Sequence, residues 1–131
     1  MAIGGLDIGT SSTKFAVFRN DGSVICESKR KYKEYGTGGI REIHPQEVWS
    51  AVVEVLEEAA VLCPEQIDGF AIAALGESFV AVDAHDRVLN ASMVTGDNRG
   101  IGEGKRIVRQ YGRKELIELT GVCPSEMYAL P

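Results

Sequence analysis

The chain opens with short apolar runs bounded by glycine and other small residues, a pattern that predicts β-strands. The first run spans residues 3–8, the second spans residues 13–19 and the third spans residues 23–31. Asn20-Asp21-Gly22, between the second and third runs, is typical of a hairpin turn. The opening of the chain is therefore predicted to be a three-stranded antiparallel meander.

A helical period follows the meander. Pro45 comes directly after His44 and suits the first position of a helix, and Cys63-Pro64 marks the end of that helix. Apolar residues between these points recur at helical spacing and predict one buried helix face: Val48, Val52, Val55, Leu56 and Ala59.

Residues 67–75 are apolar almost throughout, which predicts a fourth strand that is central and covered on both faces. Because a helix separates this strand from the meander, it can lie parallel to the first strand as a crossover. We expect three large aromatic side chains to belong to the core: Trp49, Phe70 and Phe79.

The remaining chain predicts shorter elements. A turn at residues 83–86 separates two short apolar runs, and residues 92–95 favour one more strand. Asp97 is placed to cap a helix that continues to about Tyr111. A short helix over residues 113–119 is predicted to close at Gly121.

Composition indicates an ordinary soluble globular protein, with 44% hydrophobic and 25% charged residues. The net charge of −5 gives no support to nucleic-acid binding, and we interpret the basic cluster at residues 29–33 as the solvated end of a strand. Cys26, Cys63 and Cys123 form no C-x-x-C pair and no metal-site spacing. With no signal peptide and no membrane-spanning run, the expected location is the cytoplasm.

The segment from Asp7 to Lys14 carries the clearest chemistry of the chain. Gly9 lets the backbone approach a phosphate closely, and backbone N–H groups beside three hydroxyl side chains can donate to phosphate oxygens. Those hydroxyls belong to Thr10, Ser11 and Ser12. Lys14 can supply a positive charge, and Asp7 is a suitable oxygen ligand for Mg²⁺, through water. The alternative is a Ser/Thr-rich hairpin without a ligand; a P-loop is excluded because a strand follows the turn.

This turn resembles the first phosphate loop of the actin, Hsp70 and sugar-kinase superfold. Alone, it resembles FGGY carbohydrate kinases, Hsp70-like chaperones and the ATPase activators of acyl-CoA dehydratases equally well. Further segments resemble the FGGY kinases, including their gluconokinase, xylulokinase and glycerol kinase members, in the same order along essentially all 131 residues. They are the Pro45-x-x-x-Trp49 start of a helix, residues 74–83, the x-Asp97-x-Arg99 segment, residues 118–121 and residues 128–131.

The resemblance implies an α/β fold of the actin/Hsp70/ribonuclease H-like type, with a mixed sheet flanked by helices. Residues 1–131 would be the N-terminal part of the first domain of a two-domain kinase that phosphorylates a sugar or polyol hydroxyl with ATP and Mg²⁺. The chain stops at Pro131 without a terminating element, and the family's catalytic Asp and adenine site lie further downstream. We therefore expect a fragment that does not phosphorylate by itself.

The resemblance also assigns roles to particular positions. Asp7, Gly9, Thr10, Ser11, Ser12 and Lys14 match the ATP-phosphate and Mg²⁺ side of the site. Gly76 and Glu77 match the pair that contacts substrate hydroxyls, which is Arg-Glu in glycerol kinases and Met-His in xylulokinases, so neither specificity transfers. Glu77 could instead be a solvent-facing loop acid.

Asp97 and Arg99 match positions near the substrate cleft, with a helix cap and its ion pair as the alternative. Thr95 lies near the position where the family often has Trp, so an aromatic wall is missing. Met127 or Tyr128 lies near a further substrate position.

The expected partner is a small-molecule sugar or polyol, with no nucleic acid and no membrane, and a homodimer is left open. Two rivals remain. One is an ATP-driven switch, either a dehydratase activator, for which the cysteine spacing does not provide an iron–sulfur site, or a chaperone lobe. The other is a non-enzymatic binding module with the same half-fold.

Overall fold

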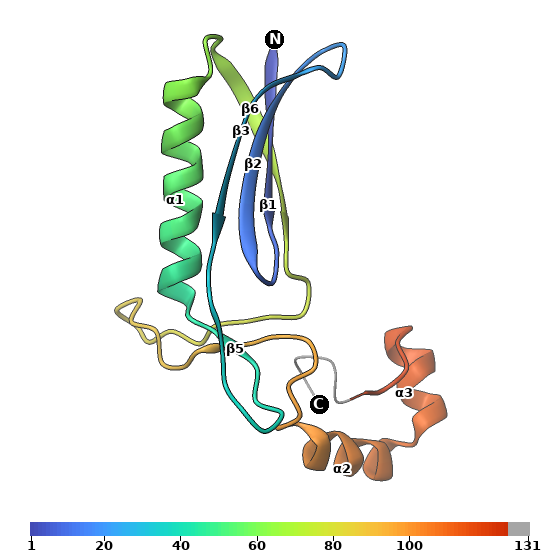
Figure 1. Ribbon diagram of the computed structural model, residues 1–131. Coiled ribbons are helices and arrows are strands. Elements are labelled where there is room, and N and C mark those ends of the chain that lie inside the picture. Colours follow the sequence, from blue (N-terminus) through green and yellow to red (C-terminus); the bar gives the residue numbers. More distant parts are fainter. Residues whose placement is uncertain (126–131) are drawn as a thin grey trace. The chain divides into compact units, whose positions relative to one another are not determined.

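A computed structural model describes residues 1–125 of the chain, which form two compact units (Figure 1). Unit 1 contains residues 1–33 and 43–76, and unit 2 contains residues 34–42 together with the described residues from Glu77 onward. Each unit is described separately below.

Unit 1 is a four-stranded mixed sheet with one long helix packed against it. The strands are β1 (Ala2–Ile8), β2 (Ser12–Arg19), β3 (Val24–Lys31) and β6 (Ile67–Ala74), in the order β3-β2-β1-β6. β2 is antiparallel to β1 and to β3, whereas β6 is parallel to β1. The predicted meander and the parallel crossover strand are both confirmed.

The helix of unit 1 is α1 (Pro45–Leu62), which begins and ends where the proline and cysteine signals predicted. It packs along β2 and β3, and its buried face meets the apolar face of the sheet (Figure 1). The core contains side chains from β1, β2 and α1: Ala2, Leu6, Phe15, Val17, Val52, Val55 and Ala59. Full burial of each large aliphatic or aromatic side chain contributes roughly 1.5–3 kcal/mol, so this interface stabilises most of unit 1.

The predicted burial of β6 and of the large aromatic residues is wrong. β6 is an edge strand, and α1 packs mainly on β2 and β3, so that Ile67 is the residue of β6 that packs against the core cluster. Phe70 and Ile72 are consequently 49% and 61% exposed. Trp49 lies on the outer face of α1, where it is 69% exposed, and Phe79 is 41% exposed.

Unit 2 combines a small sheet with two helices. The strands β4 (Glu34–Tyr35), β5 (Glu42–Ile43) and β7 (Ser92–Met93) form a three-stranded sheet in the order β4-β5-β7. α2 (Ile101–Tyr111) and α3 (Arg113–Thr120) follow and contact each other, and Gly121 closes α3 at a φ of 72°. No helix within residues 1–125 combines the length and apolar character that crossing a bilayer requires.

The start of α2 differs from the prediction. Gly100, and not Asp97, occupies the N-cap position of this helix. Asp97 instead ends a turn whose backbone hydrogen bond runs from its own N–H to the Val94 carbonyl oxygen. Gly96 lies in this turn at a φ of 90°, a conformation that favours glycine.

Gly4 and Gly5 of β1 provide a matched test of the packing in unit 1. A Cβ atom on Gly4 would lie 2.3 Å from the Phe15 ring and 2.9 Å from the Phe70 Cβ, whereas one on Gly5 meets no atom within 4 Å. The two phenylalanine rings themselves pack edge to face, with centroids 5.7 Å apart. We expect Gly4→Ala to lower the free energy of unfolding by about 1–3 kcal/mol, because one of these aromatic side chains must move. Gly5→Ala should change it by less than about 0.5 kcal/mol.

Urea denaturation of the two variants and the wild type measures this difference. Equal stability of Gly4→Ala and Gly5→Ala would contradict the packing described for Phe15 and Phe70.

Candidate functional site

The turn between β1 and β2 contains most of the predicted phosphate-binding residues. Gly9 N–H donates to the Ser12 carbonyl oxygen over 3.0 Å, which closes the turn around Thr10 and Ser11. A Cβ atom on Gly9 would lie 3.3 Å from that same carbonyl oxygen, so glycine suits this tight approach. Ser11 is exposed, and Thr10 and Ser12 are partly exposed. The turn therefore presents three hydroxyl groups at the end of the β1–β2 hairpin.

Asp7 and Lys14 flank the turn on one face of the sheet. They are directly opposite each other in the antiparallel register of β1 and β2, and both are exposed. Lys14 Nζ lies 3.0 Å from a carboxylate oxygen of Glu27 on β3. Both members of this ion pair are exposed to solvent, so the pair contributes about 0–1 kcal/mol and can exchange for another anion.

Tyr32 also belongs to this site, although the sequence interpretation did not single it out. Its backbone N–H donates to the Ser11 carbonyl oxygen over 3.3 Å, and its hydroxyl donates to the Gly9 carbonyl oxygen. Burial raises the pKa of the Tyr32 phenol; the nearby Asp7 carboxylate adds to the rise and the Thr13 side chain opposes it. The hydroxyl therefore keeps its proton and remains a donor at neutral pH.

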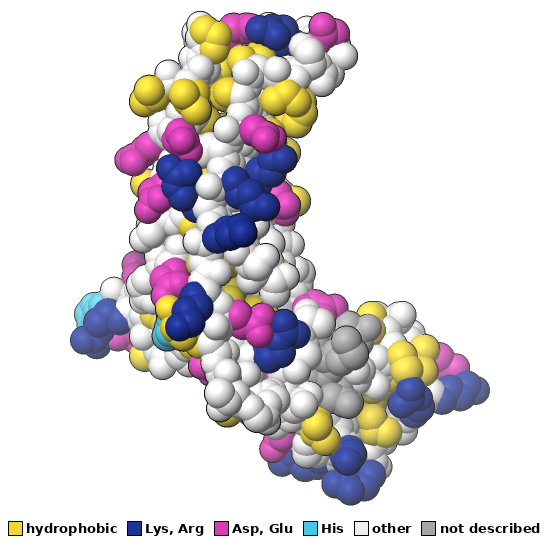
Figure 2. Space-filling view, viewed as in Figure 1, with side chains coloured by type: hydrophobic (Ala, Val, Ile, Leu, Met, Phe, Trp, Pro, Cys, Tyr) yellow, Lys and Arg dark blue, Asp and Glu magenta, His cyan; other side chains and the backbone are white. Residues whose placement is uncertain are grey.

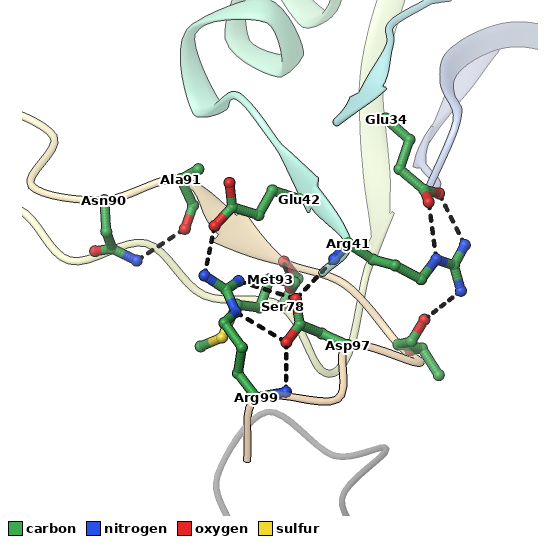
Figure 3. Close-up of polar contacts among 10 residues, drawn as sticks. Glu34, Arg41, Glu42, Ser78, Asn90, Ala91, Met93, Asp97 and Arg99 are labelled. Carbon is green, nitrogen blue, oxygen red and sulfur yellow. Dashed lines mark hydrogen bonds and ion pairs between the residues drawn. The ribbon is translucent and has the colours of Figure 1, made fainter. Parts of the chain in front are cut away.

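In unit 2, Asp97 is the centre of a saturated hydrogen-bond cluster (Figure 3). Its two carboxylate oxygens accept from the Arg41 backbone N–H over 2.7 Å, from the Arg99 backbone N–H over 3.0 Å, and from Arg99 Nε and Nη2 over 2.9 Å each. Arg99 Nη1 also donates to Glu42 Oε1 over 2.6 Å. Asp97 thus connects Arg41, which directly precedes β5, to Arg99 in the segment that follows β7.

Arg41 extends the same cluster. Its guanidinium group donates to both carboxylate oxygens of Glu34 over 2.8 Å and to the Thr95 carbonyl oxygen over 2.6 Å (Figure 3). Neither Arg41 nor Glu42 was predicted, because no short motif contains them and their contacts with Thr95, Asp97 and Arg99 join residues far apart in sequence.

The ionisation of Asp97 depends on this cluster. Asp97 is only 7% exposed, and burial alone would oppose its negative charge. Hydrogen bonds from the Arg99 side chain and from the backbone N–H groups of Arg41 and Arg99 outweigh burial and lower the pKa from 3.8 to about 2. These contacts favour the alternative in which Asp97 and Arg99 form an ion pair. Asp97 does not cap α2, because Gly100 occupies the N-cap position.

Gly76 and Glu77 lie on either side of the boundary between the two units. Gly76 is exposed and ends unit 1. Glu77 begins unit 2 and lines a cavity of about 590 Å³, to which Lys105, Arg109 and Arg113 also contribute. The cavity walls are largely apolar and come from α2, α3 and the residues after them: Ile101, Ile107, Val108, Leu116 and Val122. Asp97 and Arg99 do not line it, and the predicted substrate position at Met127 or Tyr128 lies outside the described residues.

Charged side chains of both signs are interspersed over the visible face of unit 1 (Figure 2). In the basic cluster at the end of β3, Arg30 pairs with Glu54 over 2.8 Å and with Glu58 over 2.9 Å, as expected for a solvated strand end. Within residues 1–125, no group of three or more His, Cys, Asp or Glu side chains is arranged to hold a metal ion. A cation at Asp7 would therefore need water and ligand oxygens to complete its coordination.

The Asp97 cluster predicts a specific dependence of stability on pH. Because folding lowers the Asp97 pKa, the ionised Asp97 carboxylate stabilises the folded state. This contribution is complete above about pH 4 and is lost as the pH falls towards about 2. We expect Asp97→Asn to lower the free energy of unfolding at pH 7 by about 2 kcal/mol. The difference from wild type should shrink as the pH falls through this range.

Urea denaturation across this pH range is the measurement. Asp86→Asn, which neutralises an exposed turn carboxylate, is the matched control and should leave the stability nearly unchanged. A constant difference between Asp97→Asn and wild type at all pH values would contradict the role assigned to the Asp97 charge.

Comparison with known proteins gives consistent matches. Residues 2–131 match the family model described as the FGGY family of carbohydrate kinases, N-terminal domain. The chain is 29% identical over 119 residues to a gluconokinase of Bacillus subtilis (strain 168), covering 89% of the chain and 23% of that protein. It is 31% identical over 127 residues to a glycerol kinase of Haloquadratum walsbyi (strain DSM 16790 / HBSQ001). This match covers 92% of the chain and 24% of that protein.

Solved structures agree on the fold. The crystal structure of xylulose kinase from Rhodospirillum rubrum superimposes with a TM-score of 0.91 at 23% identity, covering 97% of the chain and 27% of that structure. The chain thus spans about a quarter of the length of these relatives. Because the family model covers all but the first residue, the chain belongs to the FGGY family of carbohydrate kinases and matches its N-terminal domain.

Proposed function

We propose that the full-length protein is a carbohydrate kinase that transfers a phosphoryl group from ATP to a hydroxyl of a sugar or polyol. Residues 1–131 would be the N-terminal part of the first of two domains. The observation that carries this proposal is the β1–β2 turn, where three hydroxyl groups, Asp7 and Lys14 gather at the end of a hairpin in a chain of this family. The base that removes the substrate proton would lie downstream of residue 131.

The residues of the turn fit the phosphates of ATP. The Gly9 backbone leaves room for a close approach, and the hydroxyl groups of Thr10, Ser11 and Ser12 can donate to phosphate oxygens. Lys14 can exchange its exposed Glu27 partner for a phosphate, because that ion pair is weak. When bound, ATP supplies the phosphoryl group, and the turn holds and orients it.

Asp7 is the residue proposed to hold Mg²⁺. It is exposed, and it stands opposite Lys14 at the end of β1. A single carboxylate is enough for Mg²⁺ when waters and phosphate oxygens supply the other ligands. The cation would neutralise negative charge on the phosphates during transfer.

The substrate side is assigned to Gly76 and Glu77. Glu77 lines the cavity of unit 2 as an acceptor that can bind two neighbouring hydroxyl groups of a polyol or linear sugar. Asp97 and Arg99 are assigned a supporting role, because the Asp97 oxygens already accept four hydrogen bonds from protein groups. They would fix the segment that follows β7 and would not contact the substrate directly.

The first test is turnover by the full-length protein with Mg·ATP and a panel containing gluconate, glycerol, xylulose and related polyols. ADP release that depends on one of these compounds is expected. Asp7→Asn should lower kcat by on the order of 100-fold, because the cation loses its protein ligand. Asp21→Asn, which changes an exposed carboxylate in the β2–β3 turn of the same unit, should retain wild-type kcat.

Lack of turnover with every compound of the panel, combined with ATP hydrolysis that depends on a protein partner, would contradict the kinase proposal.

Glu77 is tested with the substrate identified by the panel. Glu77→Gln should raise KM for the sugar or polyol about tenfold, because a charge-assisted hydrogen bond is replaced by a weaker one, and should leave KM for ATP unchanged. Glu115→Gln, which changes an exposed acid on α3, serves as the control. An unchanged KM for the sugar in Glu77→Gln would remove Glu77 from the substrate site.

A further inference from the structure

The hydrogen-bond pattern at the β1–β2 turn differs from that of an ordinary two-residue hairpin. Such a turn normally exchanges two hydrogen bonds between its flanking residues. Here Gly9 N–H donates to the Ser12 carbonyl oxygen, but within residues 1–125 the Ser12 N–H makes no reciprocal bond to the Gly9 carbonyl oxygen. The Gly9 carbonyl accepts from the Tyr32 hydroxyl instead.

Tyr32 binds the turn at two points. Its hydroxyl donates to the Gly9 carbonyl oxygen, and its backbone N–H donates to the Ser11 carbonyl oxygen over 3.3 Å. Tyr32 directly follows Lys31, the last residue of β3, and Lys31 is paired with Ser12 of β2. The position of Tyr32 is therefore fixed by the sheet and does not depend on the turn that it contacts.

Because the peptide bond is planar, these two contacts also fix the directions of the neighbouring N–H groups. In a planar trans peptide the C=O and the N–H of the next residue point in opposite directions. Because the Gly9 and Ser11 carbonyls both point towards Tyr32, the N–H groups of Thr10 and Ser12 point away from it. Within residues 1–125 neither the Thr10 N–H nor the Ser12 N–H has a backbone acceptor, and backbone donors left open in this way can bind an anion.

We propose that Tyr32 is a positioning residue of the phosphate turn, which turns the Thr10 and Ser12 N–H groups towards the phosphates of ATP. This inference rests on the proposed kinase function, because it concerns the same turn. Tyr32 itself does not touch the nucleotide. Without the hydroxyl, the Gly9 carbonyl loses the contact that fixes its direction, so the Thr10 N–H of the same peptide unit is no longer held as a phosphate donor.

Tyr32→Phe in the full-length protein tests the proposal, because it removes the hydroxyl and keeps both the ring and the backbone N–H. KM for Mg·ATP should rise about three- to tenfold, while KM for the sugar or polyol stays within about twofold of wild type. Tyr111→Phe removes a tyrosine hydroxyl from the exposed surface of α2 in unit 2 and should change neither constant. Unchanged KM for Mg·ATP in Tyr32→Phe, or equal rises in both KM values, would overturn the role of Tyr32.

A second measurement does not depend on turnover or on the folding of the variant. In the full-length wild-type protein labelled with ¹⁵N-serine and ¹⁵N-threonine, Mg·ADP should shift the amide signals of Thr10 and Ser12 more than those of other labelled residues. Unmoved Thr10 and Ser12 signals on saturation with Mg·ADP would overturn the proposal. If the wild type binds Mg·ADP in this way but phosphorylates no compound, the kinase function fails, and binding of Mg·ADP to Tyr32→Phe then decides the role of Tyr32.

Discussion

The pairing of β1 along both of its edges is the constraint on which the candidate site depends. Each residue of β1 has a partner in β2, and β6 runs parallel to its other edge. At the carboxyl end of β1, Ile8 is opposite Thr13, and its carbonyl oxygen accepts from Leu75 N–H over 3.1 Å. The backbone at Ile8 is therefore held in place on both sides, and the turn begins from it at Gly9. A phosphate site built from backbone donors needs such a support, because its donors cannot be re-aimed by side-chain rotation.

Asp7 and Asp97, which the sequence assigned to the phosphate side and the substrate side of the site, differ in their physical surroundings. Asp97 is buried, its oxygens are saturated by protein donors, and its pKa falls to about 2. Asp7 is exposed at the end of β1, where water and a cation can reach it. A carboxylate whose lone pairs are already used stabilises the fold, whereas an exposed carboxylate at a strand end remains available to a ligand.

Local signals in the sequence predicted the elements of unit 1 well. Gly22 and its neighbours specified the β2–β3 turn, and Pro45 and Cys63 marked the two ends of α1. The spacing of apolar residues identified the buried face of α1. Each of these signals acts over only a few residues, so the sequence alone shows it. The burial of Phe70 and Trp49 was mispredicted, because exposure depends on which element covers a surface, and hydrophobicity alone does not specify that. Tyr32 and Arg41 escaped notice because their roles arise from contacts with residues distant in sequence.

The kinase proposal depends on the β1–β2 turn receiving the phosphates of ATP. A crystal structure of the full-length protein with Mg·ADP tests it most directly. We expect phosphate oxygens within hydrogen-bonding distance of the Thr10 and Ser12 N–H groups, with Mg²⁺ linked to Asp7 through water. Nucleotide phosphates bound away from this turn, with the Thr10 and Ser12 N–H groups bonded only to protein or solvent, would contradict it.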